Sequence, residues 1–170
     1  MRILARVNEE INRLDKEIEQ LANTQYPETT VLRQIRGVGP ITAMTFLVTL
    51  DDPRRFRSSR QVAAYLGLVP KLRESGDTGA RLRITKAGDS LLRRFLVHCA
   101  HYVLGPLNRE ECDLVLWARE YMRRGGRNAK ERAVVAVGRK LAVRLHRVWL
   151  TGEVYEPCRN QPPKNKLEVV

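Results

Sequence analysis

A serine and the basic residues around it are the part of the sequence best suited to chemistry. Ser75 and Gly76 lie in the segment 71–84, and a serine hydroxyl can attack a phosphodiester when cations stabilise the charge that develops on the phosphoryl oxygens. The cations expected to support this attack are Arg73, Arg81, Arg83 and Lys86. Gly76 has no side chain and would let a DNA backbone approach closely. The same Ser-Gly pair is also common turn chemistry, and spacing alone favours that simpler interpretation.

The sequence lacks the patterns of the common metal-dependent and nucleotide-dependent enzymes. It contains no GxxxxGK[ST] phosphate-binding loop, no HExxH pair and no acidic trio placed for two metal ions. The cysteines Cys99, Cys112 and Cys158 form no CxxC pair and are odd in number, which favours reduced thiols. A group of possible metal ligands, His98, Cys99 and His101, falls on a predicted helix, where neighbouring side chains point in different directions. We therefore expect these side chains to pack rather than to bind a metal ion. No metal or other cofactor is therefore predicted in this chain.

The positive charge is large and concentrated in two segments. The sequence has 31 Lys and Arg against 19 Asp and Glu, a formal net charge of +12. Seven basic and three acidic residues lie between positions 71 and 94, and ten basic and two acidic ones between 119 and 147. Such surfaces suit a polyanion, because each neutralised phosphate releases condensed counterions, whereas a merely solubilising surface intersperses both signs. We predict a nucleic-acid partner and, without a membrane span or secretory signal, a cytoplasmic, nucleoid-associated protein that contacts no membrane.

A glycine-rich turn between two helices is a second candidate for phosphate contact. Residues 31–50 are typical of helix, tight turn and helix, with Gly37 and Gly39 in the turn and Pro40 in the first turn of the second helix. A helix-hairpin-helix motif of this kind offers backbone N–H groups to a DNA phosphate, although the same turn can be purely structural. The residues predicted to bind DNA are Arg33, Arg36, Gly37, Gly39, Arg93, Arg94, Arg123, Arg124, Arg127, Lys130, Arg139 and Lys140.

The first 26 residues carry an apolar seam that predicts a coiled-coil assembly helix. Its apolar residues alternate at spacings of three and four. They are Leu4, Val7, Ile11, Leu14, Ile18 and Leu21. So narrow a stripe favours pairing with a helix of a second copy, giving a dimer or tetramer, or with a missing part of the protein. The alternative is an amphipathic helix that lies on its own domain.

The remaining elements predict an all-α chain with one helical domain over residues 27–152. Ser58 or Ser59 is expected to cap a short helix, and Asp89 and Asn128 are expected to begin longer ones. Basic helices should span 111–150, separated by a glycine pair, while segment 71–84 is predicted to form a loop or small hairpin. Residues 153–170 lack apolar periodicity and are predicted to be an extended, flexible tail.

Four ordered motifs resemble one family of mobile-element enzymes. They are GVGPITA, DDPRRFRSSRQVAAYLGLVP, RESG and RITKAGDSLLRR, spread over about residues 31–105, with a looser match to about residue 150. This order is similar to the C-terminal transposase domain of insertion-sequence recombinases that combine a RuvC-like DEDD domain with a serine-bearing domain. These relatives of the Piv DNA invertase are guided by a bridge RNA.

The resemblance implies that Ser75 is the nucleophile that joins DNA covalently, and that the coiled coil serves assembly. It also implies a structured guide RNA as a partner and magnesium in a RuvC-like domain, which this sequence lacks, so that the chain is expected to bind DNA without recombining it alone. The chain is then an excised fragment, a remnant or a separately made piece. Asp89 stands where the family pattern has Asn, a change compatible with helix capping. The rival predictions are a noncatalytic helix-hairpin-helix DNA-binding module and an RNA-binding adaptor.

Overall fold

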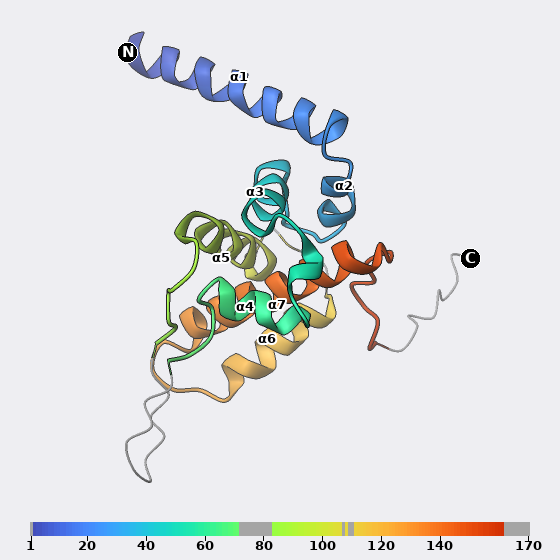
Figure 1. Ribbon diagram of the computed structural model, residues 1–170. Helices are drawn as coiled ribbons and strands as arrows, with labels where there is room; N and C mark the ends of the chain where they lie inside the picture. The colour runs from blue at the N-terminus through green and yellow to red at the C-terminus, as the bar shows by residue number, and fades with distance from the viewer. Residues whose placement is uncertain (1, 72–82, 107, 109–110, 162–170) are drawn as a thin grey trace, which may run out of the picture.

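The described part of the chain is all-α, as predicted from the sequence. The computed structural model describes residues 2–71, 83–106, 108 and 111–161. Within them lie seven α-helices and one short 3-10 helix (Figure 1). The elements are α1 (Arg2–Thr24), α2 (Glu28–Arg33), α3 (Pro40–Leu50), η1 (Pro53–Arg55), α4 (Ser59–Tyr65), α5 (Ser90–Leu104), α6 (Asp113–Arg123) and α7 (Ala129–Thr151).

The long helix α7 is the centre of the domain. The helices α2, α4, α5 and α6 and the 3-10 helix all pack against it, so that its apolar face is buried on several sides. Val137, Leu141 and Leu145 on this face are fully buried. Phe46 of α3 is also fully buried and meets the Trp149 ring edge-on, with 6.2 Å between centroids. This packing leaves the other face of α7, which carries most of its cations, near the surface.

Helix α1 extends away from the rest of the molecule (Figure 1). The N-terminal part of its apolar seam is unpartnered in this single chain, because Leu4, Ile11 and Leu14 are 67%, 50% and 44% exposed. The residues of α1 that approach the domain include Asp15 and Glu19, roughly a third of a turn around the helix from the seam. Towards the C-terminal end of the helix the seam is partly covered, because Ile18 is half-buried where α1 contacts α2 and α3. Both interpretations of this helix therefore stay predictions.

Two of the three predicted helix caps differ from expectation. Asp89 caps α5 as predicted, since its carboxylate accepts a hydrogen bond from the Leu92 N–H at 2.6 Å. Ser58 and Asn128 occupy N-cap positions, but neither side chain makes a capping hydrogen bond. Asn128 instead has a left-handed backbone with φ of 57°. This conformation follows a glycine-rich turn and is one that asparagine tolerates better than most residues.

The described part of the segment after α7, residues 153–161, is hydrogen-bonded to the domain. Residues 153–161 run back along α6 and α2 without forming a helix. The Tyr155 N–H donates to the Gln34 side chain at 2.8 Å, and the Asp113 N–H donates to the Pro157 carbonyl at 3.0 Å. Asn160 donates to the Asp113 carboxylate. Polar contacts hold the segment, which explains why apolar periodicity did not reveal it.

Candidate nucleic-acid interface

The two ends of the predicted serine loop are paired with each other. Pro70 and Ile84 form an antiparallel bridge. The Lys71 N–H donates to the Arg83 carbonyl, and the Thr85 N–H to the Val69 carbonyl, each at 2.9 Å. These bonds pair residues 69–71 with residues 83–85 in a short stem, and the predicted loop or small hairpin lies mostly outside the described residues. Ser75, Gly76, Arg73 and Arg81 lie outside the described residues, whereas Arg83 and Lys86 are described and exposed.

Two glycines fix this stem to the α4–α5 junction. Gly67 has φ of +66°, and a Cβ there would collide with the Ala87 backbone N. A Cβ at Gly88 would collide with the Tyr65 carbonyl oxygen. Lys86 lies between them with φ of 57°, and its N–H donates to the Gly67 carbonyl at 3.0 Å. The backbone segments that carry the stem thus approach each other more closely than side chains would allow.

Arg93 joins the same junction, although the sequence suggested that it binds DNA. Its guanidinium donates to the carbonyl oxygens of Leu66 at 3.0 Å and Gly88 at 3.1 Å. The side chain is half-buried, and these bonds tie the end of α4 to the start of α5. Its neighbour Arg94 is exposed. The geometry gives Arg93 a positioning role at the base of the stem and leaves Arg94 as the cation available to a ligand.

The glycine-rich turn is packed rather than open. Gly37 has φ of +88°, and a Cβ there would meet the Tyr102 ring at 3.0 Å and the Cys99 carbonyl at 3.3 Å. Arg33, predicted to bind phosphate, instead forms an ion pair with Glu19 of α1 at 3.2 Å. The α2–α3 turn therefore serves first as a structural hairpin against α5, and Arg36 is exposed beside it.

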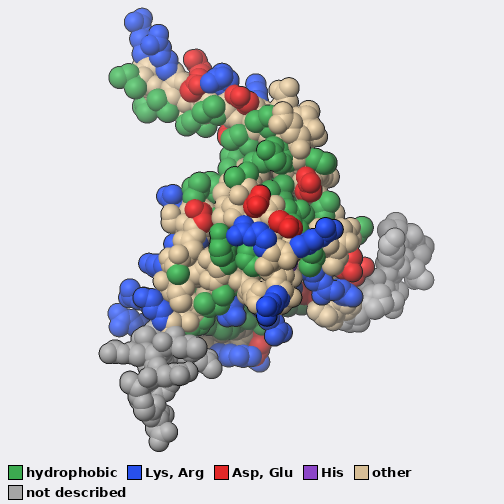
Figure 2. Space-filling view, in the orientation of Figure 1, with side chains coloured by type: hydrophobic (Ala, Val, Ile, Leu, Met, Phe, Trp, Pro, Cys, Tyr) green, Lys and Arg blue, Asp and Glu red, His purple; other side chains and the backbone are tan. Residues whose placement is uncertain are grey.

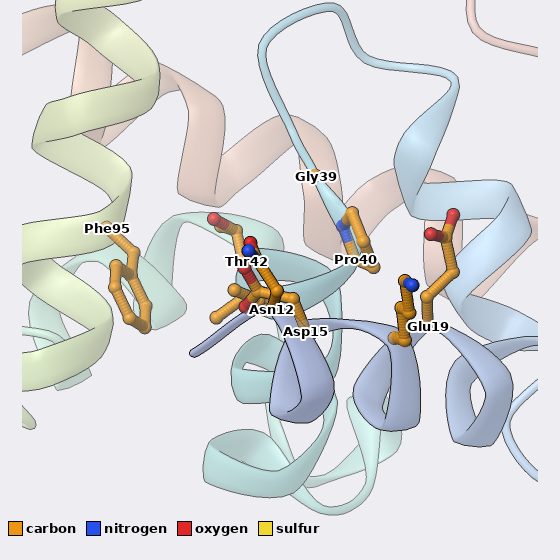
Figure 3. Close-up of a pocket in the computed structure, with 9 residues that line it drawn as sticks. Asn12, Asp15, Glu19, Gly39, Pro40, Thr42 and Phe95 are labelled. Atoms are coloured by element: carbon orange, nitrogen blue, oxygen red, sulfur yellow. The ribbon is translucent and has the colours of Figure 1, made fainter. Parts of the chain in front are cut away.

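An open cleft of about 720 Å³ lies between α1 and the start of α3. Figure 3 shows the α1 residues Asn12, Asp15 and Glu19 close to Gly39 and Pro40, with Phe95 of α5 at one end. No Cβ contact limits Gly39, so the backbone there is accessible from the cleft. The charges that line the cleft are mixed, because Lys16 faces it together with Asp15 and Glu19, and Glu19 is paired with Arg33. The phosphate contact at this turn therefore stays a prediction.

The cations of α6 and α7 fall into two groups. Several are engaged internally: Arg123 pairs with Glu120 at 2.9 Å, and the Lys140 ammonium lies 4.2 Å from the centroid of the Trp117 ring. Burial, together with Arg144 and Arg139 nearby, lowers the pKa of Lys140. A second group has no ion pair or side-chain hydrogen bond within the described residues. Its members are Arg124, Arg127, Lys130 and Arg139.

Two features of this interface were missed from the sequence. His146 of α7 is fully buried, with Nδ1 2.9 Å from the Ser59 hydroxyl and Nε2 2.8 Å from the Pro53 carbonyl. Because a carbonyl only accepts, Nε2 carries the proton and Nδ1 accepts from the serine. Arg54, Arg57 and Arg60 lie on the segment that this histidine anchors. Three arginines at spacings of three were the signal that could have indicated this surface.

The predicted His98, Cys99 and His101 group is dispersed around α5. Cys99 is buried and its thiol contacts the Thr42 hydroxyl at 3.7 Å, whereas both histidines are exposed. Burial raises the pKa of the Cys99 thiol. Among the described residues no three His, Cys, Asp or Glu side chains are grouped to hold a metal ion. No helix among them is long and apolar enough to cross a membrane.

Comparison with known proteins finds similarity to a family of transposases. Residues 29–111 match the family described as Transposase IS116/IS110/IS902. The transposase for insertion sequence element IS1111A of Coxiella burnetii is 30% identical over 148 residues, covering 87% of this chain and 40% of that protein. The transposase for insertion sequence element IS1328 of Yersinia enterocolitica is 32% identical over 148 residues, covering 84% and 43%.

A third relative is named for gene inversion. The pilin gene-inverting protein of Moraxella lacunata is 36% identical over 73 residues, covering 41% of this chain and 22% of that protein. Residues 29–111 are therefore similar to the transposase domain of the IS110/IS116 family, in line with the resemblance found in the sequence. It spans less than half the length of each of these three relatives.

Proposed function

We propose that this chain is the DNA-handling part of a mobile-element transposase and that Ser75 is its nucleophile. The observation that carries the proposal is the paired stem of residues 69–71 and 83–85, which lies inside the stretch that matches the transposase family. The stem joins the segment containing Ser75 to a tightly packed junction. Exposed Arg83 and Lys86 stand at its base, where they can neutralise a DNA phosphate.

The proposed reaction is a transfer of a DNA phosphate to serine. The Ser75 oxygen forms a bond to phosphorus, its proton passes to a base, and one bridging oxygen leaves as the new end of the cut strand. A second DNA end then attacks the phosphoserine and releases the serine. Arg73, Arg81, Arg83 and Lys86 are proposed to stabilise the negative charge on the phosphoryl oxygens during both steps. Gly76 is proposed to give the strand access.

The duplex beside the cut is proposed to lie on the basic face of α6 and α7. Arg124, Arg127, Lys130 and Arg139 supply cations there that are not paired within the described residues. Arg94, which is exposed on α5, is proposed to join them. A structured guide RNA, implied by the family resemblance, would compete for the same phosphate-binding cations.

Assembly of two copies through α1 is the proposed source of a complete reaction complex. Its exposed seam would be covered by the same seam of a second chain, as in a two-stranded coiled coil. Magnesium is proposed to act from a RuvC-like domain on another segment or chain. Among the described residues no three His, Cys, Asp or Glu side chains are grouped to hold magnesium, so no step is assigned to the metal within this chain.

Trapping the covalent intermediate tests this function. In the complete transposase, Ser75→Ala should abolish protein–DNA adducts on a nicked suicide substrate while DNA affinity stays unchanged. Ser58→Ala is the matched control, because Ser58 is exposed and makes no capping hydrogen bond. Adducts that persist in Ser75→Ala would remove Ser75 from the mechanism. DNA binding without adducts in the wild-type protein would leave only a noncatalytic binding module.

A further inference from the structure

Three exposed arginines form a basic surface on a different part of the domain from α6. Arg54 of η1, Arg57 of the following turn and Arg60 of α4 are all exposed. None forms an ion pair with a carboxylate among the described residues. We call this set the η1–α4 arginines. Unpaired guanidinium groups with planar donor pairs are well suited to bind the nonbridging oxygens of phosphates.

The backbone that carries these arginines is held rigidly. The Asp52 carboxylate accepts from the Arg54 N–H at 2.8 Å, and the Gln61 side chain accepts from the Arg57 N–H at 2.9 Å. Beneath them, buried His146 bridges Pro53 and Ser59. A ligand that binds here would therefore not have to order the chain, which lowers the entropic cost of binding.

The surface is separate from Arg124, Arg127 and Lys130, because these cations lie near the start of α7, roughly 24 Å along the helix from His146. Arg139 lies two turns before His146 and so on the same face of α7. η1 and α4 contact α7 on the side of His146, whereas α6 contacts it on the side of Lys140. These positions are six residues apart, which places them roughly a third of a turn apart around the helix. Figure 2 shows Lys and Arg side chains, with Asp and Glu side chains beside them, over the middle of one face, where Figure 1 places α4 and the segment before it.

Two acidic residues adjoin the surface but form no ion pair with it among the described residues. Asp51 and Asp52 precede it in sequence, and Asp52 is engaged as the cap of η1. On α6, by contrast, Arg119 and Arg123 pair with Glu111 and Glu120. The η1–α4 arginines thus keep their charge available, although the α6 segment has the higher count of basic residues.

We propose that the η1–α4 arginines bind the phosphate backbone of a second DNA duplex, so that one chain holds two DNA segments at once. The inference rests on the proposed DNA binding of the α6–α7 face. A duplex is the expected ligand because the three exposed cations follow one another at spacings of three along one segment, which suits the successive phosphates of a DNA backbone. The two surfaces would bring donor and target DNA together.

The test compares two triple variants with an equal loss of charge. R54Q/R57Q/R60Q removes the proposed surface, and R2Q/R6Q/R13Q removes three exposed charges from α1. Affinity for a labelled duplex is measured by anisotropy from low to moderate salt. Capture of a second labelled duplex by an immobilised one measures bridging, and both assays are done in an Ile11→Glu background to exclude bridging by paired chains.

The expected result is a loss of bridging in R54Q/R57Q/R60Q, with binding to a single duplex retained through α6 and α7. The salt slope of the bridging equilibrium should fall by about two to three units relative to the α1 control, whereas the slope for binding a single duplex should not change. Equal salt slopes and equal bridging in the two triple variants would overturn the inference. An RNA hairpin that displaces the second labelled duplex more strongly than unlabelled duplex DNA does would also overturn it. Failure of the wild-type chain to bind any duplex would instead refute the proposed function.

Discussion

Arg93 and Arg94 are adjacent in sequence, but the structure assigns them opposite roles. Replacing Arg93 with Met keeps the length of the side chain and removes both hydrogen bonds to the Leu66 and Gly88 carbonyls. A hydrogen bond to a charged group contributes about 1.5–3 kcal/mol, and two shared by one half-buried side chain are not additive, so we expect a loss of about 2–3 kcal/mol in unfolding free energy. For a domain of this size that corresponds to a decrease in Tm of about 5–10 °C.

Urea denaturation followed by circular dichroism measures this loss, and anisotropy with a labelled duplex measures DNA affinity. Arg93→Met should be destabilised, with DNA affinity near that of the wild type under conditions where it is folded. Arg94→Met should keep its stability and bind DNA several-fold more weakly at low salt. A stable Arg93→Met protein with the same loss of affinity as Arg94→Met would refute the reasoning from these contacts.

Three further predictions concern the core, the seam and the thiols. His146→Ala should lower the unfolding free energy by about 2–4 kcal/mol in urea titrations, because it leaves a cavity and an unpaired carbonyl; unchanged stability would contradict the buried bridge. Ile11→Glu should convert oligomers into monomers in sedimentation velocity, whereas Asn8→Glu on the polar face should not. Cys158 should react with a thiol reagent at neutral pH well before buried Cys99, and equal rates would contradict the packing of α5. The raised pKa of Cys99 means that the folded state binds the thiol proton more tightly than the unfolded state does. The resulting stabilisation is complete below the ordinary thiol pKa and declines as the pH rises above it. Urea titrations of Cys99→Ala should therefore lack this part of the alkaline decline in stability.

The helices were predictable because local signals agreed with one another. Apolar residues at helical spacing, the Asp89 cap and the glycines after each helix placed α5, α6 and α7 within a few residues of their observed bounds. The left-handed backbone of Gly37 was likewise predictable from the tight turn. These features depend on neighbours in sequence, so the sequence of this chain alone was enough to predict them.

The assignment of individual cations was not predictable, because it depends on distant partners. Arg93 bonds to the carbonyl of Leu66, which is 27 residues away, and Arg33 pairs with Glu19 of α1. Neither partner can be recognised from charge counts. The net charge of this segment also concealed Arg54, Arg57 and Arg60. Asp51 and Asp52 lower that net charge, although neither forms an ion pair with these arginines among the described residues.

The most direct measurement of the central claim is the mass of the peptide that becomes attached to DNA. The complete transposase would be trapped on a suicide substrate, digested with nuclease and protease, and the modified peptide sequenced by tandem mass spectrometry. The proposed mechanism predicts a nucleotide joined through phosphate to the Ser75 oxygen. A nucleotide attached to any other side chain, or a trapped complex without a covalent bond, would contradict it.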